Sequence, residues 1–113
     1  MIKVTINGAS GKMGTKVSNL IKNDSSLIEC FDDISCSDLV IDFSQPSSTK
    51  KILKKCVAAK KPIIIGTTGF SNDDLKEIRD ASNSIPIVLA ANMSKGIIYL
   101  KKSIASFYSK QPR

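Results

Sequence analysis

The hydrophobic pattern of this chain switches repeatedly between the two-residue period of a strand and the spacing of a helix face. Residues 2–6 alternate β-branched with polar side chains, whereas Val17, Leu20 and Ile21 recur at helical spacing. Wholly apolar runs such as residues 62–66 are typical of strands covered on both faces. The pattern predicts strands over residues 2–6, 27–31, 39–43, 62–66 and 85–90, and helices over residues 13–23, 46–59, 72–81 and 95–108.

This near-strict alternation predicts a single α/β domain, a Rossmann-like doubly wound parallel sheet of about five strands. One connection is unusual, because residues 32–38 join the second strand to the third without a helix. Seven extended residues reach roughly 23 Å, just enough to return along one strand and cross beyond the first strand. The third strand is therefore expected to flank the first strand on the side opposite to the second.

Polar residues indicate where the helices begin. Ser44 or Ser47 is expected to cap the helix over residues 46–59, whose first turn holds Pro46. Ser71 is expected to cap the next helix, which carries two aspartates in its first turn.

The chain of 113 residues carries seventeen Lys and Arg against ten Asp and Glu, a formal net charge of +7. Lysines cluster over residues 50–61 and again beyond residue 95. Nucleic-acid readers usually add arginine forks or exposed aromatics, but aromatic residues make up only 5% here. We therefore interpret the lysines as solvated helix faces and expect no nucleic-acid partner.

Several classes of function are excluded or disfavoured by composition. The chain contains no histidine, which excludes histidine-based nucleophiles, general acids and metal ligands. Cys30, Cys36 and Cys56 are odd in number and lack C-x-x-C spacing, so neither a disulfide framework nor a zinc site is indicated, and a reducing cytosol fits best. No signal peptide or membrane span is expected, which favours a cytoplasmic protein without a membrane partner.

Three glycines after the first strand are the first chemical feature. Gly8, Gly11 and Gly14 lie between a strand and a helix, although Ser10 stands where G-x-G-x-x-G has its second glycine. Such a turn binds phosphate through unsatisfied backbone amides at the positive end of the helix dipole. An acid, Asp32 or Asp33, follows the second strand where a ribose partner belongs, and we assign that contact to Asp33.

Each later strand also ends in small polar residues, at residues 44–46, 67–68 and 92–94. In a parallel sheet these ends face the same edge as the glycine turn, and ligands bind outside that edge.

Four motifs in this arrangement resemble the 4-hydroxy-tetrahydrodipicolinate reductase family, also called dihydrodipicolinate reductase, which serves lysine and diaminopimelate synthesis. The motifs are GASGKMG at 8–14, VIDFSQP at 40–46, IGTTGF at 65–70 and ANMSKG at 91–96.

The resemblance implies that the chain binds NAD or NADP as the nucleotide-binding half of an oxidoreductase. It implies that the pyrophosphate is held by Gly8, Ala9, Ser10, Gly11, Lys12 and Met13, that Gly66, Thr67 and Thr68 lie along the nicotinamide, and that Ala90, Ala91, Asn92 and Met93 close over the cofactor.

Compared with the family that it resembles, this chain differs at three points. The segment before residue 40 is shorter than usual, the acids at 32 and 33 lean toward NAD, and the catalytic domain with its histidine pair and catalytic lysine is missing. We expect a dinucleotide-binding domain over residues 1–94 and a hinge helix over 95–113 leading to that absent domain. The small dicarboxylate substrate then binds only where a catalytic domain is supplied.

Two other classes of function stay open. A freestanding dinucleotide-binding or sensor module would bind the cofactor without turnover, and a nucleic-acid-binding protein would show steep salt dependence. The apolar stripe of the last predicted helix must pack on the sheet or on another chain, which leaves room for a homo-oligomer.

Overall fold

The computed structural model describes residues 2–9, 11–31 and 33–89. Along the chain the elements are β1 (Ile2–Asn7), α1 (Lys12–Lys22), β2 (Leu27–Glu29), the 3₁₀ turn η1 (Ile34–Cys36), β3 (Leu39–Asp42), α2 (Pro46–Ala59), β4 (Ile63–Ile65), α3 (Asn72–Ala81) and β5 (Ile87–Leu89). The helix expected over 95–108, and the expected boundary between residues 94 and 95, lie outside the described residues.

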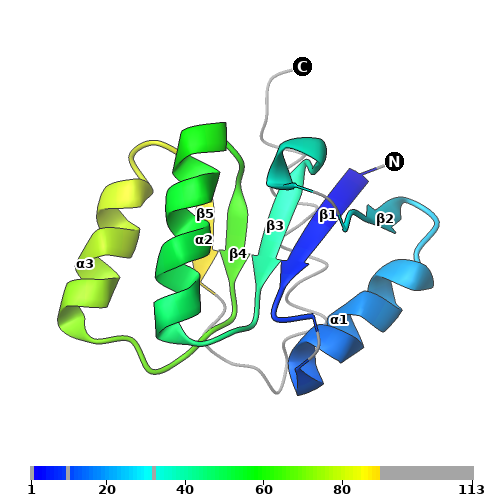
Figure 1. Ribbon diagram of the computed structural model, residues 1–113, viewed down its shortest axis with the longest axis horizontal. Coiled ribbons are helices and arrows are strands. Elements are labelled where there is room, and N and C mark those ends of the chain that lie inside the picture. Colours follow the sequence, from blue (N-terminus) through cyan, green and yellow to red (C-terminus); the bar gives the residue numbers. More distant parts are fainter. Residues whose placement is uncertain (1, 10, 32, 90–113) are drawn as a thin grey trace.

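The five strands form one sheet in the order β2-β1-β3-β4-β5, and every neighbouring pair is parallel. The predicted fold class is thereby confirmed, and so is the crossing of β3 to the far side of β1. The arrowheads of β1, β3 and β4 point toward the same edge in Figure 1. The register pairs Asn7 with Asp42 and Asp42 with Ile65, so the carboxyl ends of these three strands meet at that edge.

The two faces of the sheet carry separate apolar clusters. On one face Val17 and Ile21 of α1 pack against Val4 and Ile6 of β1. On the other face α2 and α3 cover the sheet, as Figure 1 shows, and their buried residues pack with Ile63 and Ile65 of β4. Because β3 and β4 contribute to both clusters, their side chains are apolar on both faces, as the wholly apolar runs predicted.

The helices begin differently from one another. Ser71 caps α3 as predicted, because its hydroxyl accepts a hydrogen bond from the Asp74 amide at 3.1 Å. The expected serine cap of α2 is wrong: Gln45 is the N-cap residue, and no side chain caps the helix there. The Ser44 hydroxyl instead donates a hydrogen bond to the buried Asp42 carboxylate at 2.6 Å.

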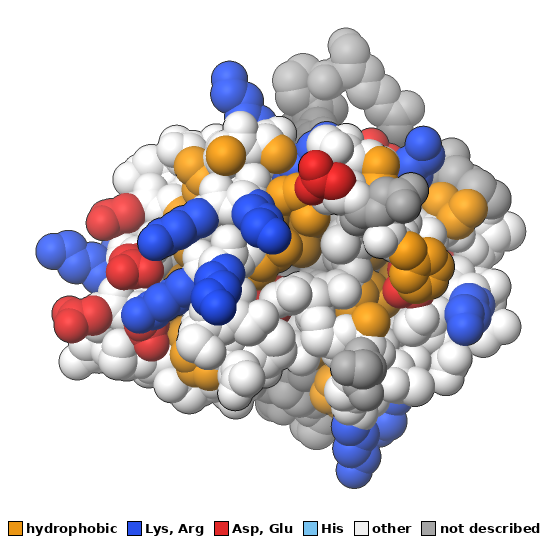
Figure 2. Space-filling model, in the orientation of Figure 1, with side chains coloured by type: hydrophobic (Ala, Val, Ile, Leu, Met, Phe, Trp, Pro, Cys, Tyr) orange, Lys and Arg blue, Asp and Glu red, His pale blue; other side chains and the backbone are white. Residues whose placement is uncertain are grey.

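Basic and acidic side chains gather over neighbouring helices. Lysines cover the exposed face of α2, and acidic residues lie over α3 beside them (Figure 2). Lys50 of α2 and Asp74 of α3 form an ion pair at 2.5 Å. This pairing raises the pKa of Lys50 and lowers the pKa of Asp74, which also accepts a hydrogen bond from the Ser71 backbone. None of the helices within the described ranges is long and apolar enough to cross a membrane.

The short connection between β2 and β3 contains a disulfide between Cys30 and Cys36, which the sequence analysis did not expect. The number and spacing of the cysteines do not reveal this disulfide, because pairing depends on how the chain folds back. Here η1 turns the segment so that Cys36 returns to Cys30. Cys56 is the free cysteine of the described part, and burial raises the pKa of its thiol to about 12.

Candidate functional site

Parallel strand ends place most of the predicted site residues at one edge of the sheet. The glycine turn follows β1, and Gly66, Thr67 and Thr68 follow β4. Helix α1 starts at this edge with Lys12 and Met13. Among the predicted contacts, Ser10, Ala90, Ala91, Asn92 and Met93 lie outside the described residues.

Two glycines of the turn are required by the fold itself. Gly8 has a φ of 87°, and a Cβ atom there would lie 2.4 Å from the Phe43 carbonyl oxygen. A Cβ atom on Gly14 would lie 1.9 Å from the Gly8 carbonyl oxygen. Both contacts are with backbone, which has little room to move. Gly8 and Gly14 therefore let α1 and the end of β3 approach the turn closely.

Gly11 differs from both. Its φ is −76°, and the nearest atom to an added Cβ would be the Gly8 carbonyl oxygen at 3.4 Å. It is the N-cap residue of α1, where no side chain caps the helix and no acid stands in the first turn. Unsatisfied first-turn amides and the helix dipole favour an anion at this position. A side chain at Gly11 would stand over those amides, whereas packing leaves room for one there.

A buried carboxylate joins the strand ends behind the turn. Asp42, at the end of β3, is fully buried, and its two oxygens accept hydrogen bonds from four side chains. Asn7 and Ser44 donate to Oδ1 at 2.8 and 2.6 Å, while Thr67 donates to Oδ2 at 2.8 Å. Thr49 of α2 donates to the same Oδ2. Four donors match the lone-pair sites of a carboxylate, so Asp42 is a structural anchor rather than a free base.

Thr67 is held in place by the Asp42 carboxylate. Its hydroxyl donates to Asp42 and accepts a hydrogen bond from the Ser44 amide at 3.0 Å. The side chain is buried, whereas the neighbouring Thr68 is exposed at the sheet edge. Gly66 packs against the Phe43 ring, since an added Cβ would lie 2.1 Å from it. Of these three residues, Thr68 has the exposed hydroxyl.

The sequence comparisons place this arrangement in a family. The profile described as "Dihydrodipicolinate reductase, N-terminus" matches residues 24–93. A 4-hydroxy-tetrahydrodipicolinate reductase from Alkaliphilus oremlandii is 41% identical over 81% of this chain and 42% of its own length. One from Helicobacter hepaticus is 35% identical over 90% of this chain and 49% of its own length. The chain belongs to the dihydrodipicolinate reductase family. It spans about half the length of the curated relatives it matches.

A solved structure agrees on the fold of the dihydrodipicolinate reductase domain. Dipicolinate-bound dihydrodipicolinate reductase from Paenisporosarcina sp. TG-14 superposes with a TM-score of 0.69 at 20% identity. The match covers 85% of this chain and 49% of that chain. The amino-terminal fold of the reductase family is thus shared.

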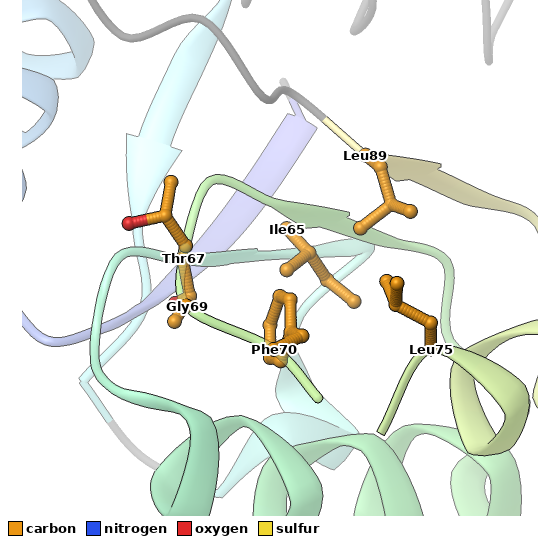
Figure 3. A pocket seen from close by; sticks show the side chains of 7 residues that line it. Ile65, Thr67, Gly69, Phe70, Leu75 and Leu89 are labelled. Carbon is orange, nitrogen blue, oxygen red and sulfur yellow. The ribbon is translucent and has the colours of Figure 1, made fainter. Parts of the chain in front are cut away.

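An apolar hollow adjoins the Gly66–Thr68 segment in this reductase-family domain. Ile65, Phe70, Leu75 and Leu89 point toward one another around it, while the Thr67 hydroxyl is directed away (Figure 3). The hollow has a volume of about 230 Å³. Leu75 and Leu89 are 37% and 43% exposed, so this is open apolar surface beside the polar strand ends. The sequence alone does not reveal this hollow, because Leu75 and Leu89 come from different elements that only the fold brings together.

Asp33 lies in the connection between β2 and β3, directly before η1. It is the N-cap residue of η1, is exposed, and makes no side-chain cap hydrogen bond.

Proposed function

We propose that this chain binds NAD or NADP along the carboxyl edge of its sheet, as the dinucleotide-binding part of a 4-hydroxy-tetrahydrodipicolinate reductase. Gly11 carries the proposal: it is the glycine that packing does not require, at a helix start without a side-chain cap. Family membership supplies the reaction class. The bound dinucleotide would supply the hydride.

Different residues of the chain would contact different parts of the dinucleotide. The amides of Lys12 and Met13 would receive the pyrophosphate, with Gly8 and Ala9 shaping the turn before them. Asp33 would accept a ribose hydroxyl. Thr68 and the apolar hollow would flank the nicotinamide end, and Asp42 would keep Thr67 and Ser44 in place behind it.

The proton donor for the reaction would come from elsewhere. The chain contains no histidine, and threonine and serine hydroxyls are too weakly acidic to protonate a substrate at neutral pH. The dicarboxylate substrate would likewise need a catalytic domain. We therefore propose that the domain ends near residue 94 and that residues 95–113 lead toward a catalytic domain. We place the protein in the cytoplasm with a nicotinamide dinucleotide, not nucleic acid, as its partner.

A fluorescence titration with NADH tests the binding. The 113-residue chain should bind in the micromolar range or more weakly, because it spans about half the length of its relatives and contributes one side of the cleft. Gly11→Leu should abolish binding by standing over the α1 amides, while its far-UV circular dichroism and melting temperature stay close to wild type. Asn19→Leu is the matched control: it adds the same side chain to an exposed position two turns along α1, roughly 12 Å away. Equal affinity in Gly11→Leu and Asn19→Leu would remove the turn from the site.

A turnover assay tests whether the chain alone catalyses the reduction. With freshly made substrate, NADH oxidation by the chain alone should match a no-protein control, because positioning and proton donation each supply several powers of ten, at about 1.4 kcal/mol per tenfold. Oxidation well above that control, and lost in Thr68→Val, would show that the site is complete without further groups. Tight cofactor binding with no turnover under any addition would instead favour a freestanding sensor module.

A further inference from the structure

The segment between β2 and β3 is held at both ends without its disulfide. At one end the Cys30 amide donates to the Val4 carbonyl at 2.7 Å. At the other end Asp38 exchanges hydrogen bonds with the Lys3 backbone, accepting at 2.9 Å through its carboxylate and donating at 2.7 Å. Ile34 is buried against α2. Reducing the disulfide would therefore leave the two thiols as neighbours.

Both sulfur-bearing residues are also accessible. Cys30 and Cys36 are half-buried and line an open surface hollow together with Lys3 and Phe31. The Phe31 side chain is 81% exposed and does not cover the hollow. An open surface gives a small external disulfide access to the two sulfur atoms, and the thiolate is the form that reacts with it. Cys56, by contrast, is fully buried.

We propose that Cys30 and Cys36 form a thiol–disulfide exchange site for low-molecular-weight disulfides and dithiols, whose oxidation fixes the segment that carries Asp33. In the oxidising direction, one thiolate attacks a sulfur of the external disulfide and expels one thiolate from it. The second cysteine thiolate then attacks the mixed disulfide and expels the other. Two electrons pass to the external disulfide, and the two cysteine protons go to the released thiolates.

The ring closed by this bond contains the exposed Asp33 and Phe31 between two anchored ends. Fixing Asp33 lowers the ordering cost of any ligand that it contacts. The effect on ligand affinity rests on the proposed function, in which Asp33 binds the ribose. The exchange chemistry does not.

Mass spectrometry of the full chain tests the exchange site. Fully reduced protein is equilibrated with mixtures of oxidised and reduced glutathione, quenched in acid, alkylated with N-ethylmaleimide and mapped by peptide. We expect an internal Cys30–Cys36 disulfide that dithiothreitol reverses, with Cys56 alkylated only after denaturation. Cys36→Ser should instead keep one glutathione on Cys30, because the resolving thiol is gone. Separate alkylation of Cys30 and Cys36 at every glutathione ratio, or two stable glutathione adducts on the wild type, would overturn the proposal.

An NADH titration of the oxidised and reduced forms tests the consequence. The oxidised form should bind about threefold to tenfold more tightly, and Cys36→Ser should match the reduced form at every redox poise. Equal affinity of the two forms would overturn the effect on Asp33. If neither form bound NADH, the proposed function would fail, whereas the mass measurement would still decide the exchange site.

Discussion

Helices α1 and α3 both begin after a parallel strand, at the carboxyl edge of the sheet, but their first turns are built in opposite ways. At α3, Ser71 and Asp74 form a reciprocal capping box, and two acids stand in the first turn. At α1, the N-cap residue is a glycine, no side chain caps the helix, and the first turn holds no acid. The chain satisfies the start of α3 with its own side chains, whereas no side chain caps the start of α1.

This contrast bears on the anion site proposed at the start of α1. Every helix has unsatisfied first-turn amides and a positive dipole end, so these alone do not distinguish α1. The distinguishing feature is that Gly11 is a glycine without a packing reason, flanked by Gly8 and Gly14, which have one. Substitutions can distinguish a glycine that packing requires from one that it does not.

The largest effect is expected for Gly14→Ala. The added methyl group would meet the Gly8 carbonyl, and neither backbone segment can move without disturbing the contact with Phe43. We expect a loss of about 3 kcal/mol in the free energy of unfolding, measured by urea denaturation. Gly11→Ala is the control and should lose less than about 1 kcal/mol. Similar losses in both variants would erase the distinction between the two glycines.

Gly11→Asp should make the start of α1 resemble that of α3. An aspartate is a better N-cap than glycine and complements the dipole, so stability should rise by roughly 0.5 kcal/mol. NADH affinity should fall on the order of tenfold or more, because a negative charge would then face the pyrophosphate. Gly11→Asn caps equally well without the charge, and it should retain more affinity than Gly11→Asp. If Gly11→Asp bound NADH as tightly as wild type, the dinucleotide would have to lie elsewhere.

The smallest effect concerns the ion pair that supports the α3 cap. Lys50→Met should lower the melting temperature slightly at neutral pH and low salt, since exposed ion pairs contribute little. The folded-state pKa of Asp74 is lowered, so its contribution is present above the ordinary value of 3.8 and is lost as the pH falls below it. The folded-state pKa of Lys50 is raised, so its contribution is lost as the pH rises past 10.5.

The pH profile of thermal melting tests this window. The difference between wild type and Lys50→Met should be greatest between those limits and shrink toward both ends. Lys51→Met removes an exposed lysine from the same helix and serves as the control. A difference that persisted unchanged in strong acid would show that Lys50 contributes by packing rather than by charge.

Most of the fold was predictable because the signals for it are local. Alternating residues in 2–6, the apolar run at 62–66 and the Ser71 cap each act within one element or one turn. The crossing of β3 beyond β1 followed from the reach of a seven-residue connection, which is a constraint of chain length alone. The glycine turn was found in the same way, since strand, glycines and helix adjoin in sequence.

The sequence by itself determined the order of the elements and the segments that meet at the carboxyl edge, because periodicity and turn chemistry depend on near neighbours. Only the tertiary structure decided what the side chains there do. Asn7 and Thr67 meet Asp42 across 35 and 25 residues of sequence, and this contact fixes the Thr67 hydroxyl on the buried carboxylate. The same holds for Cys30 and Cys36 and for the separate roles of Gly11 and Gly14. Each depends on which backbone atoms lie within a few ångströms, a distance that strand register and helix packing set and residue spacing does not.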